Sequence, residues 1–364
     1  MEMNKIHVKY PKIAQYRNVV ADIKHKVKFN GIDETGNVVY LDGIDMPKIK
    51  FKGTVKLHGT NAAVCYNNSQ GLWVQSRSKI ISVGNDNYGF AMFVEQHRSD
   101  FIKLFFDLKD TKKIDLHNTV VIFGEWAGEG IQNGVGISEF EKSFYIFGAK
   151  EMIDEEGIWR DHTDLRSDNR LIHNIEEFPT YSIDIDFNNP ELVQSKLSDI
   201  TDKVEQECPV SKQLGKPNQL GEGIVWTGEY DGELYRFKVK GQKHSSTNVK
   251  KLAKVDVEKL NSMIEFADYA VTLNRVEQGV QVVKEEMISE SLSNVNKNFN
   301  LDKLSPKMIG RVIGWVVKDV LEEEVDTIVA NNIDAKLVKR FLSDKARKYI
   351  FQLMEHGTKD TRSK

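Results

Sequence analysis

The sequence predicts an α+β fold followed by a small all-helical domain. Short runs of β-branched or aromatic residues, bounded by turn residues, recur as far as residue 239 and are typical of strands. From about residue 256 this pattern stops, and successive amphipathic helices take its place. The 364 residues also exceed the length of a typical single domain. We therefore predict two domains, residues 1–243 and 244–364, joined by a linker within 241–255.

The strands are predicted from the N-terminus onward. Residues 26–29 and 38–41 flank a turn-rich stretch, which indicates a hairpin within 26–42. The two strongest runs, 119–123 and 144–147, are each closed by a glycine, as buried strands tend to be. Further strands are expected at 49–55, 71–76, 223–226 and 234–239, and a helix is expected over 90–106. The polar, mixed sequence of residues 151–215 gives little indication of secondary structure.

The clearest helix of the second domain opens at Ser305 and Pro306. Serine is a favoured N-cap residue, and proline is favoured at the first helical position. Apolar residues then recur at helical spacing from 309 to 321, which predicts one buried face.

Composition and charge limit the class of protein. With 40% hydrophobic and 29% charged residues the chain can bury a core, which excludes a disordered or fibrous protein. The net charge of -3 argues against a histone-like binder. From Arg236 to Lys254, however, the chain carries lysines and arginine without any Asp or Glu. This basic run is either a solvated surface or a surface that binds nucleic-acid phosphates.

The sequence also favours a cytoplasmic protein. The N-terminal residues lack the apolar run of a signal peptide, and no stretch reaches the ~18 apolar residues that span a bilayer. The two cysteines, Cys65 and Cys208, do not have metal or redox spacing. We expect a reducing compartment and no membrane partner.

Lys56 is the first candidate for chemistry. It ends a predicted strand and precedes a glycine-containing turn, Leu-His-Gly-Thr-Asn. Such a lysine can present its amine in a pocket, and it becomes a nucleophile when burial or nearby positive charge lowers its pKa. The alternative is a surface lysine before a turn.

Two carboxylates and two further lysines accompany Lys56. Glu125 lies just after one predicted buried strand, and Glu222 lies just before another. Lys238 and Lys240 alternate along a predicted strand, so they share one of its faces. Such lysines are ordinarily solvated. Directed into a pocket, they would bind phosphate and lower the pKa of a third lysine.

In this order the residues resemble the motifs of the covalent nucleotidyltransferases, which include ATP- and NAD-dependent ligases and mRNA capping enzymes. The match comprises residues 56–61, Glu125, Phe147, Glu222, and Lys238 with Lys240. The histidine at the third position of 56–61, together with segment 123–132, narrows the resemblance to the RNA ligase 2 family of phage and kinetoplastid editing ligases. The resemblance extends from about residue 8 to 325 and is weak at 20–50 and 151–215.

This resemblance implies a nucleotidyltransferase (adenylation) domain of antiparallel sheets flanked by helices. It also implies roles for the matched residues. Lys56 would attack the α-phosphorus of ATP and form a lysyl-adenylate. Glu125 would hold the ribose, and Glu222 would position Mg²⁺ or Mn²⁺, because hard cations prefer carboxylate oxygen. Lys238 and Lys240 would bind the phosphates and offset the charge that develops on them.

Other matched positions would complete the pocket and act on the polynucleotide. Phe147 would stack on adenine, the alternative being a core phenylalanine of a strand. Arg77 would lie near the ribose and the 5′-phosphate, and His58 and Asn61 would shape the pocket. In the helical domain, Arg275 and Asp319 match residues used in steps on the polynucleotide, the alternative being an exposed ion pair.

The implied reaction has three steps: adenylation of Lys56, transfer of AMP to a 5′-phosphate, and displacement of AMP by a 3′-hydroxyl. The expected partner is RNA, as a nicked duplex or RNA–DNA hybrid, acted on by a monomer in the cytoplasm (the host's, if phage-encoded). The alternatives are a DNA ligase or GTP-using capping-type enzyme, and a nucleic-acid-binding relative without catalysis. His58 and the helical C-terminus argue against the first; the intact lysines and carboxylates argue against the second.

Overall fold

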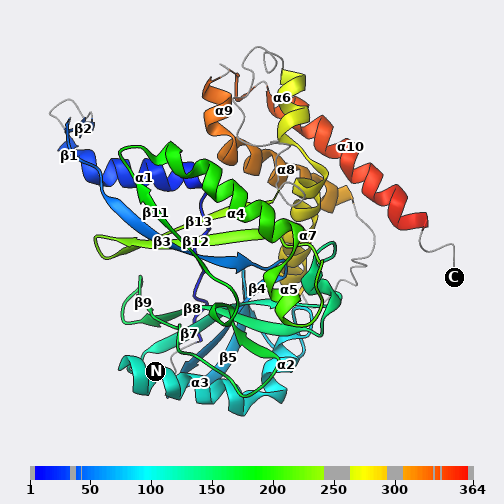
Figure 1. Cartoon of the computed structure of the whole chain (residues 1–364). Helices are drawn as coiled ribbons and strands as arrows, with labels where there is room; N and C mark the ends of the chain where they lie inside the picture. The colour runs from blue at the N-terminus through cyan, green and yellow to red at the C-terminus, as the bar shows by residue number, and fades with distance from the viewer. Residues whose placement is uncertain are drawn as a thin grey trace. The chain divides into compact units, whose positions relative to one another are not determined.

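The computed structural model describes residues 5–32, 38–41, 43–241, 263–292, 306–330, 333–336 and 338–359. Within it the chain divides into two compact units, Met1–Gly241 and Gln242–Lys364. The first unit contains all the described strands, and the second contains helices (Figure 1). Most of the predicted linker, and the basic run beyond residue 241, lie outside the described residues.

The first unit contains a four-stranded antiparallel sheet that carries Lys56. Its order is β11 (Tyr181–Asp186), β3 (Lys48–Lys56), β12 (Gly223–Tyr230) and β13 (Glu233–Lys240). Along β3 the side chains alternate, so that Ile49 and Phe51 are buried while Lys50 and Lys52 are exposed. The apolar face packs against α1 (Tyr16–Lys28) and α4 (Gln194–Gln206). The lysines of β3 project from the opposite face of the sheet.

The second sheet of this unit has seven strands. Its order is β10 (Ile172–Asn174), β8 (Ser143–Met152), β7 (Thr119–Ala127), β4 (Thr60–Asn67), β5 (Gly71–Ser76) and β6 (Ile80–Ile81), and β9 (Ile158–Arg160) also pairs with β8. The neighbours are antiparallel except for β10 and β8. The central strands are buried on both faces, which explains their continuous apolar runs.

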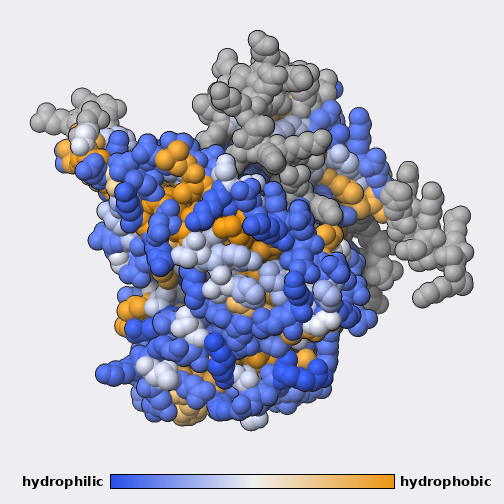
Figure 2. Space-filling model, viewed as in Figure 1, coloured by the Kyte–Doolittle hydropathy of each residue, from blue (hydrophilic) through white to orange (hydrophobic). Residues whose placement is uncertain are grey.

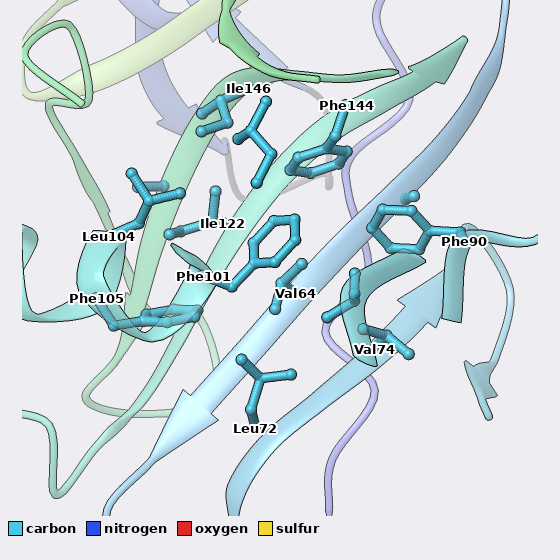
Figure 3. Close-up of a cluster of buried hydrophobic side chains, with 14 of the residues drawn as sticks. Val64, Leu72, Val74, Phe90, Phe101, Leu104, Phe105, Ile122, Phe144 and Ile146 are labelled. Atoms are coloured by element: carbon cyan, nitrogen blue, oxygen red, sulfur yellow. The ribbon is translucent and has the colours of Figure 1, made fainter. Parts of the chain in front are cut away.

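Two helices cover one face of the seven-stranded sheet. α2 (Phe90–Gln96) and α3 (Arg98–Lys112) place Phe90, Phe101 and Phe105 against the sheet, and none of these side chains has exposed surface. Figure 3 shows Phe101, Leu104 and Phe105 lying over side chains of β4, β7 and β8. Dense packing of this kind holds the strand ends that carry the site.

Shorter elements complete the first unit. The hairpin of β1 (Phe29–Ile32) and β2 (Val38–Tyr40) leaves Phe29, Tyr40 and Leu41 exposed, and Figure 2 shows apolar surface at this hairpin. The remaining elements are η1 (Gly136–Glu139), η2 (Ile175–Glu177), η3 (Pro190–Val193) and α5 (Pro209–Gln213). Strands, 3₁₀ turns and helices alternate within residues 151–215, so the apolar residues of that stretch do not follow one period in the sequence.

The described part of the second unit consists of helices around one core. They are α6 (Met263–Ala270), α7 (Leu273–Leu292), α8 (Pro306–Glu323), α9 (Val325–Ala330) and α10 (Val338–Lys359). Val312, Val316 and Val320 of α8 are fully buried at intervals of four, which confirms the predicted face. Ser305, the predicted cap, lies outside the described residues. Among the helices described, none is long and apolar enough to cross a bilayer.

The predicted α+β class is confirmed, with local corrections. Residues 26–28, expected in a strand, are the last turn of α1. Val19 and Ile23 are buried and Val27 packs beside them, so the apolar interval here is four residues rather than two. The hairpin itself is present, with Phe29 paired with Tyr40. The expected helix over 90–106 is divided into two helices at His97.

Phe101→Ala should destabilise the first unit by about 3–5 kcal/mol, because it removes a fully buried ring and leaves a cavity. Phe106→Ala, on the same helix but 42% exposed, is the matched control and should cost less than about 1 kcal/mol. Urea unfolding followed by tryptophan fluorescence measures both. Equal losses in the two variants would contradict the assigned core.

Candidate active site

The site begins with one row of three residues across the four-stranded sheet. Lys56 at the end of β3 and Lys240 at the end of β13 both lie opposite Gly223, the first residue of β12. Residues directly opposite one another in a sheet share a face, so the two lysine side chains project to the same side. Lys238 lies two residues before Lys240 and therefore shares that face.

Glu222 joins the two lysines. Its Oε2 accepts a hydrogen bond from Nζ of Lys56 at 2.6 Å, and its Oε1 lies 3.0 Å from Nζ of Lys240. The Glu222 side chain is 1% exposed, so its charge must be balanced by these neighbours. Burial alone would raise the pKa of Glu222, but Lys56 and Lys240 outweigh it and hold the pKa well below the usual range. The carboxylate is therefore ionised.

Glu125 approaches the same site from the other sheet. It lies on β7 opposite Asn61 of β4, and its Oε1 accepts a hydrogen bond from the backbone N–H of Gly59 at 3.0 Å. A side chain at Gly59 would place its Cβ 2.3 Å from the carbonyl oxygen of Trp126, so only glycine fits there. Burial raises the pKa of Glu125, and Lys56 partly offsets this effect.

The turn after Lys56 brings His58 to the same carboxylate. Nδ1 of His58 lies 3.5 Å from Oε2 of Glu222. The backbone carbonyl of Leu57 accepts a second, longer hydrogen bond from Nζ of Lys56, at 3.3 Å. The amine of Lys56 is therefore held from two directions, by the carboxylate of Glu222 and by the carbonyl of Leu57.

The ionisation of Lys56 differs from the sequence expectation. Burial acts to lower the pKa of Lys56, and the charge of Arg77 acts in the same direction. The carboxylates of Glu222 and Glu125 act more strongly, so the pKa of Lys56 is raised above its usual value. The expectation of a lowered pKa is therefore wrong for the protein alone, because two carboxylates that motif order does not place near the amine outweigh burial and Arg77.

Phe147 and Arg77 flank this cluster. Phe147 lies in a β-bulge of β8. The pairing with β7 passes from Phe123–Gly148 to Gly124–Ile146, so Phe147 has no opposite residue on β7. It is half-buried and packs against apolar clusters of both sheets. Arg77 follows β5, is exposed, and is near enough to act on the charge of Lys56. The structure thus brings Lys56, His58, Glu222 and Lys240 into contact and places Glu125 and Arg77 near enough to act on the charge of Lys56, whereas Phe147 is placed only by its packing against Tyr10 and the apolar clusters.

Arg275 and Asp319 lie in the second unit and form a buried ion pair. Nε of Arg275 is 3.0 Å from Oδ2 of Asp319, and Nη2 is 3.4 Å from Oε1 of Glu324. The guanidinium also donates to the carbonyl of Ala270, and Arg275 has no exposed surface. The ion pair that was the alternative to a role on the polynucleotide is thus present, but it is buried rather than exposed, because α7 and α8 pack their apolar faces around it. In this conformation Arg275 is placed to stabilise the helical unit.

One residue that the sequence analysis missed contacts Phe147. The ring of Tyr10 lies 5.1 Å from that of Phe147 in an edge-to-face arrangement. Tyr10 precedes the first predicted element, and nothing in its local pattern indicates this contact. Only the fold brings the N-terminal segment across the sheet.

Comparison with known proteins identifies one matching family and one set of similar solved structures. The model of the RNA ligase family matches residues 49–240, which is more than half of the chain and includes Lys56 and Lys240. No curated protein matches the chain. A solved lysine-to-alanine mutant of Naegleria gruberi RNA ligase with ATP and Mn has a TM-score of 0.41 and 16% identity. The match covers 65% of this chain and 57% of that one.

A second structure of the Naegleria ligase, with PPi, gives a TM-score of 0.40 and 15% identity over 66% of this chain and 60% of the other. The chain therefore covers less than two thirds of either solved protein.

Glu222→Gln should lower the pKa of Lys56. The substitution removes the strongest interaction that holds the proton on Nζ, while burial and Arg77 still act to remove it. The measurement is the pH dependence of Lys56 modification by a small amine-reactive reagent, followed by mass spectrometry. Lys50, which is exposed on the same strand, is the internal control. An unchanged Lys56 profile would contradict the assigned contact.

Arg275→Ala should destabilise the helical unit by about 3–5 kcal/mol, because it leaves two buried carboxylates without their cation. Lys318→Ala is the matched control, since this neighbour of Asp319 is 76% exposed. Loss of helical circular dichroism on heating measures both. A control that loses as much as Arg275→Ala would refute the buried role.

Proposed function

Because the chain belongs to the RNA ligase family, whose model it matches over more than half of its length, we propose that it is an ATP-dependent RNA ligase with Lys56 as its nucleophile. One observation carries the proposal: the amine of Lys56 shares a buried carboxylate with Lys240 on one sheet face. A relative that binds nucleic acid without catalysis would have no chemical need to keep this arrangement. The activity is a proposal, because this chain covers only part of the length of the solved ligases.

The residues present fit a nucleoside triphosphate. Lys56, Lys238 and Lys240 share a sheet face, and Arg77 adds a fourth cation nearby, which suits a chain of phosphates. Phe147 offers a half-buried aromatic ring for the base. Glu125 and Asn61 lie opposite one another on the adjoining strands, where hydroxyl groups of a ribose would find acceptors.

The acidic residues fit a divalent cation that is shared with the nucleotide. Among the described residues no group of three or more His, Cys, Asp or Glu side chains could hold a metal alone. Glu222, with Glu125 beside it, would therefore be its protein ligand, and phosphate oxygens and water would supply the rest. When bound, Mg²⁺ or Mn²⁺ would neutralise charge on the phosphate oxygens. The solved Naegleria ligase was obtained with ATP and Mn.

Lys56 performs the first step. Its Nζ attacks the α-phosphorus of ATP, a phosphorus–nitrogen bond forms, and pyrophosphate departs with the electrons of the broken phosphorus–oxygen bond. Before the attack Nζ must lose a proton to solvent, and the 2.6 Å hydrogen bond to Oε2 of Glu222 fixes the position of the amine. Lys240 holds the other oxygen of that carboxylate, which keeps Glu222 in position.

The later steps join RNA. The phosphate oxygen of a 5′-phosphorylated end displaces Lys56 from AMP, and a 3′-hydroxyl then displaces AMP to form the phosphodiester. We propose that the substrate is a nick in duplex RNA or an RNA–DNA hybrid, sealed by a monomer in the cytoplasm. The family match supports RNA over DNA as the partner, and the basic sheet face suits the phosphates of either.

Wild-type protein incubated with a divalent cation and α-labelled ATP should become covalently labelled, and Lys56→Ala should not. Lys50→Ala is the matched control, because Lys50 lies on the same strand face but is exposed and away from Glu222. A denaturing gel detects the label. An unlabelled wild type, in a preparation shown to carry no AMP beforehand, would overturn the proposal, and labelled GTP and NAD would then be compared. For a labelled protein, nicked RNA, hybrid and DNA duplexes would identify the polynucleotide.

A further inference from the structure

The N-terminal segment joins the two sheets of the first unit. Gln75 of β5 exchanges two hydrogen bonds with the backbone of Val8, at 3.0 and 2.6 Å. Six residues later, Ala14 exchanges two backbone hydrogen bonds with β13, from its N–H to Arg236 and from the N–H of Lys238 to its carbonyl. In Figure 1 this dark blue segment runs from the seven-stranded sheet to α1, beside the four-stranded sheet. The segment thus covers the free edge of β13.

Tyr10, midway along this segment, packs edge-on among three aromatic rings. Its ring centroid lies 5.1 Å from Phe123, 5.1 Å from Phe147 and 5.6 Å from Trp159. Edge-to-face contacts fix the relative angles of rings as well as their separation. Phe147 therefore has a definite orientation even though it lies in a bulge, where strand pairing alone would not determine it.

Arg236 closes this cluster from the other sheet. Its guanidinium lies 4.1 Å from the ring centroid of Trp159 and 5.8 Å from that of Tyr10, and these are cation–π contacts. Arg236 is on β13 at two residues before Lys238 and four before Lys240, so all three share the face of the sheet that carries the phosphate-binding lysines. Trp159 is on β9 of the opposite sheet.

The cluster is packed tightly next to Phe147. A Cβ added at Gly148 would lie 3.2 Å from the Trp159 ring and 3.9 Å from the Tyr10 ring. The two rings thus rest directly on the backbone that follows Phe147. Displacing either ring would allow Phe147 to change its orientation. It would also allow the separation between the two sheets to change.

We propose that Tyr10, Trp159 and Arg236 are positioning residues that hold Phe147 and fix the separation of the two sheets where the base of ATP binds. This rests on the proposed function, because it takes ATP as the ligand. The cluster itself does not touch the reacting atoms, which lie at the Lys56 row, four residues along the strand from Arg236. Its loss should therefore weaken nucleotide binding and spare the chemistry of Lys56.

The test is the dependence of self-adenylation on ATP concentration. In Trp159→Leu and in Arg236→Met, the half-saturating ATP concentration should rise about tenfold, the scale of losing one aromatic or cation–π contact. The maximal rate should change by less than about twofold, since the Lys56 row is intact. Trp159→Phe and Tyr10→Phe, which keep the rings, should restore most of the affinity. Ile158→Ala, an exposed neighbour of Trp159, is the matched control.

Several outcomes would overturn the inference. One is an unchanged half-saturating concentration in folded Trp159→Leu. Another is a fall in the maximal rate with no change in that concentration. If only Arg236→Met weakens ATP, Arg236 binds the nucleotide itself and the cluster has no positioning role. Thermal unfolding identifies any variant that does not fold, and Tyr10→Leu, which removes the ring that contacts Phe147, then replaces Trp159→Leu as the decisive variant.

Failure of the proposed function would be seen separately. A wild type that takes no label from ATP refutes the ligase proposal. Calorimetric binding of ATP to the same variants would then still decide whether the cluster supports a nucleotide pocket, with equal affinity in wild type and Trp159→Leu as the refuting result.

Discussion

The carboxylate of Glu222 is the group on which the site depends. It is almost without exposed surface, and an ionised carboxylate in such a place is tolerated only when it is paired and hydrogen-bonded. Lys56 and Lys240 supply that pairing from two different strands, with His58 beside them. Each lysine is thereby held at a defined distance from the other. A surface lysine pair would lack this constraint, because long solvated side chains lose entropy when they are ordered.

The strand register makes this pairing possible. Lys56, Gly223 and Lys240 form one row because β3, β12 and β13 pair without a shift at this end. A slip of one residue would turn one lysine to the opposite face, where Ile49, Phe51 and Trp226 are packed against helices. The apolar alternation of β3 therefore does two things at once. It builds the core under the sheet, and it fixes which lysines share the face that carries Lys56.

Much of this could be predicted from the sequence, and the limits have physical causes. Alternation placed Lys238 and Lys240 on one face, because that depends on local spacing. Glu222 lies 166 residues from Lys56, and only the family resemblance associated the two. The bulge at Phe147 and its contact with Tyr10 depend on pairing between distant strands, which spacing does not report. The burial of Arg275 depends on two helices folding around it. The turn of α1 at 26–28 was misjudged because lysines there alternate with apolar residues as in an edge strand.

The balance of charge explains why the site holds more cations than its own carboxylates need. Glu222 and Glu125 raise the pKa of Lys56, so the amine rests in its protonated form. Phosphates placed beside it would raise that pKa further, since any negative charge favours the ammonium ion. Arg77 opposes this effect directly, and Lys238 and Lys240 add positive charge on the same sheet face, which phosphates can balance in place of Lys56. A polyphosphate suits such a set of cations, because their charge balances its own and lets Lys56 give up its proton.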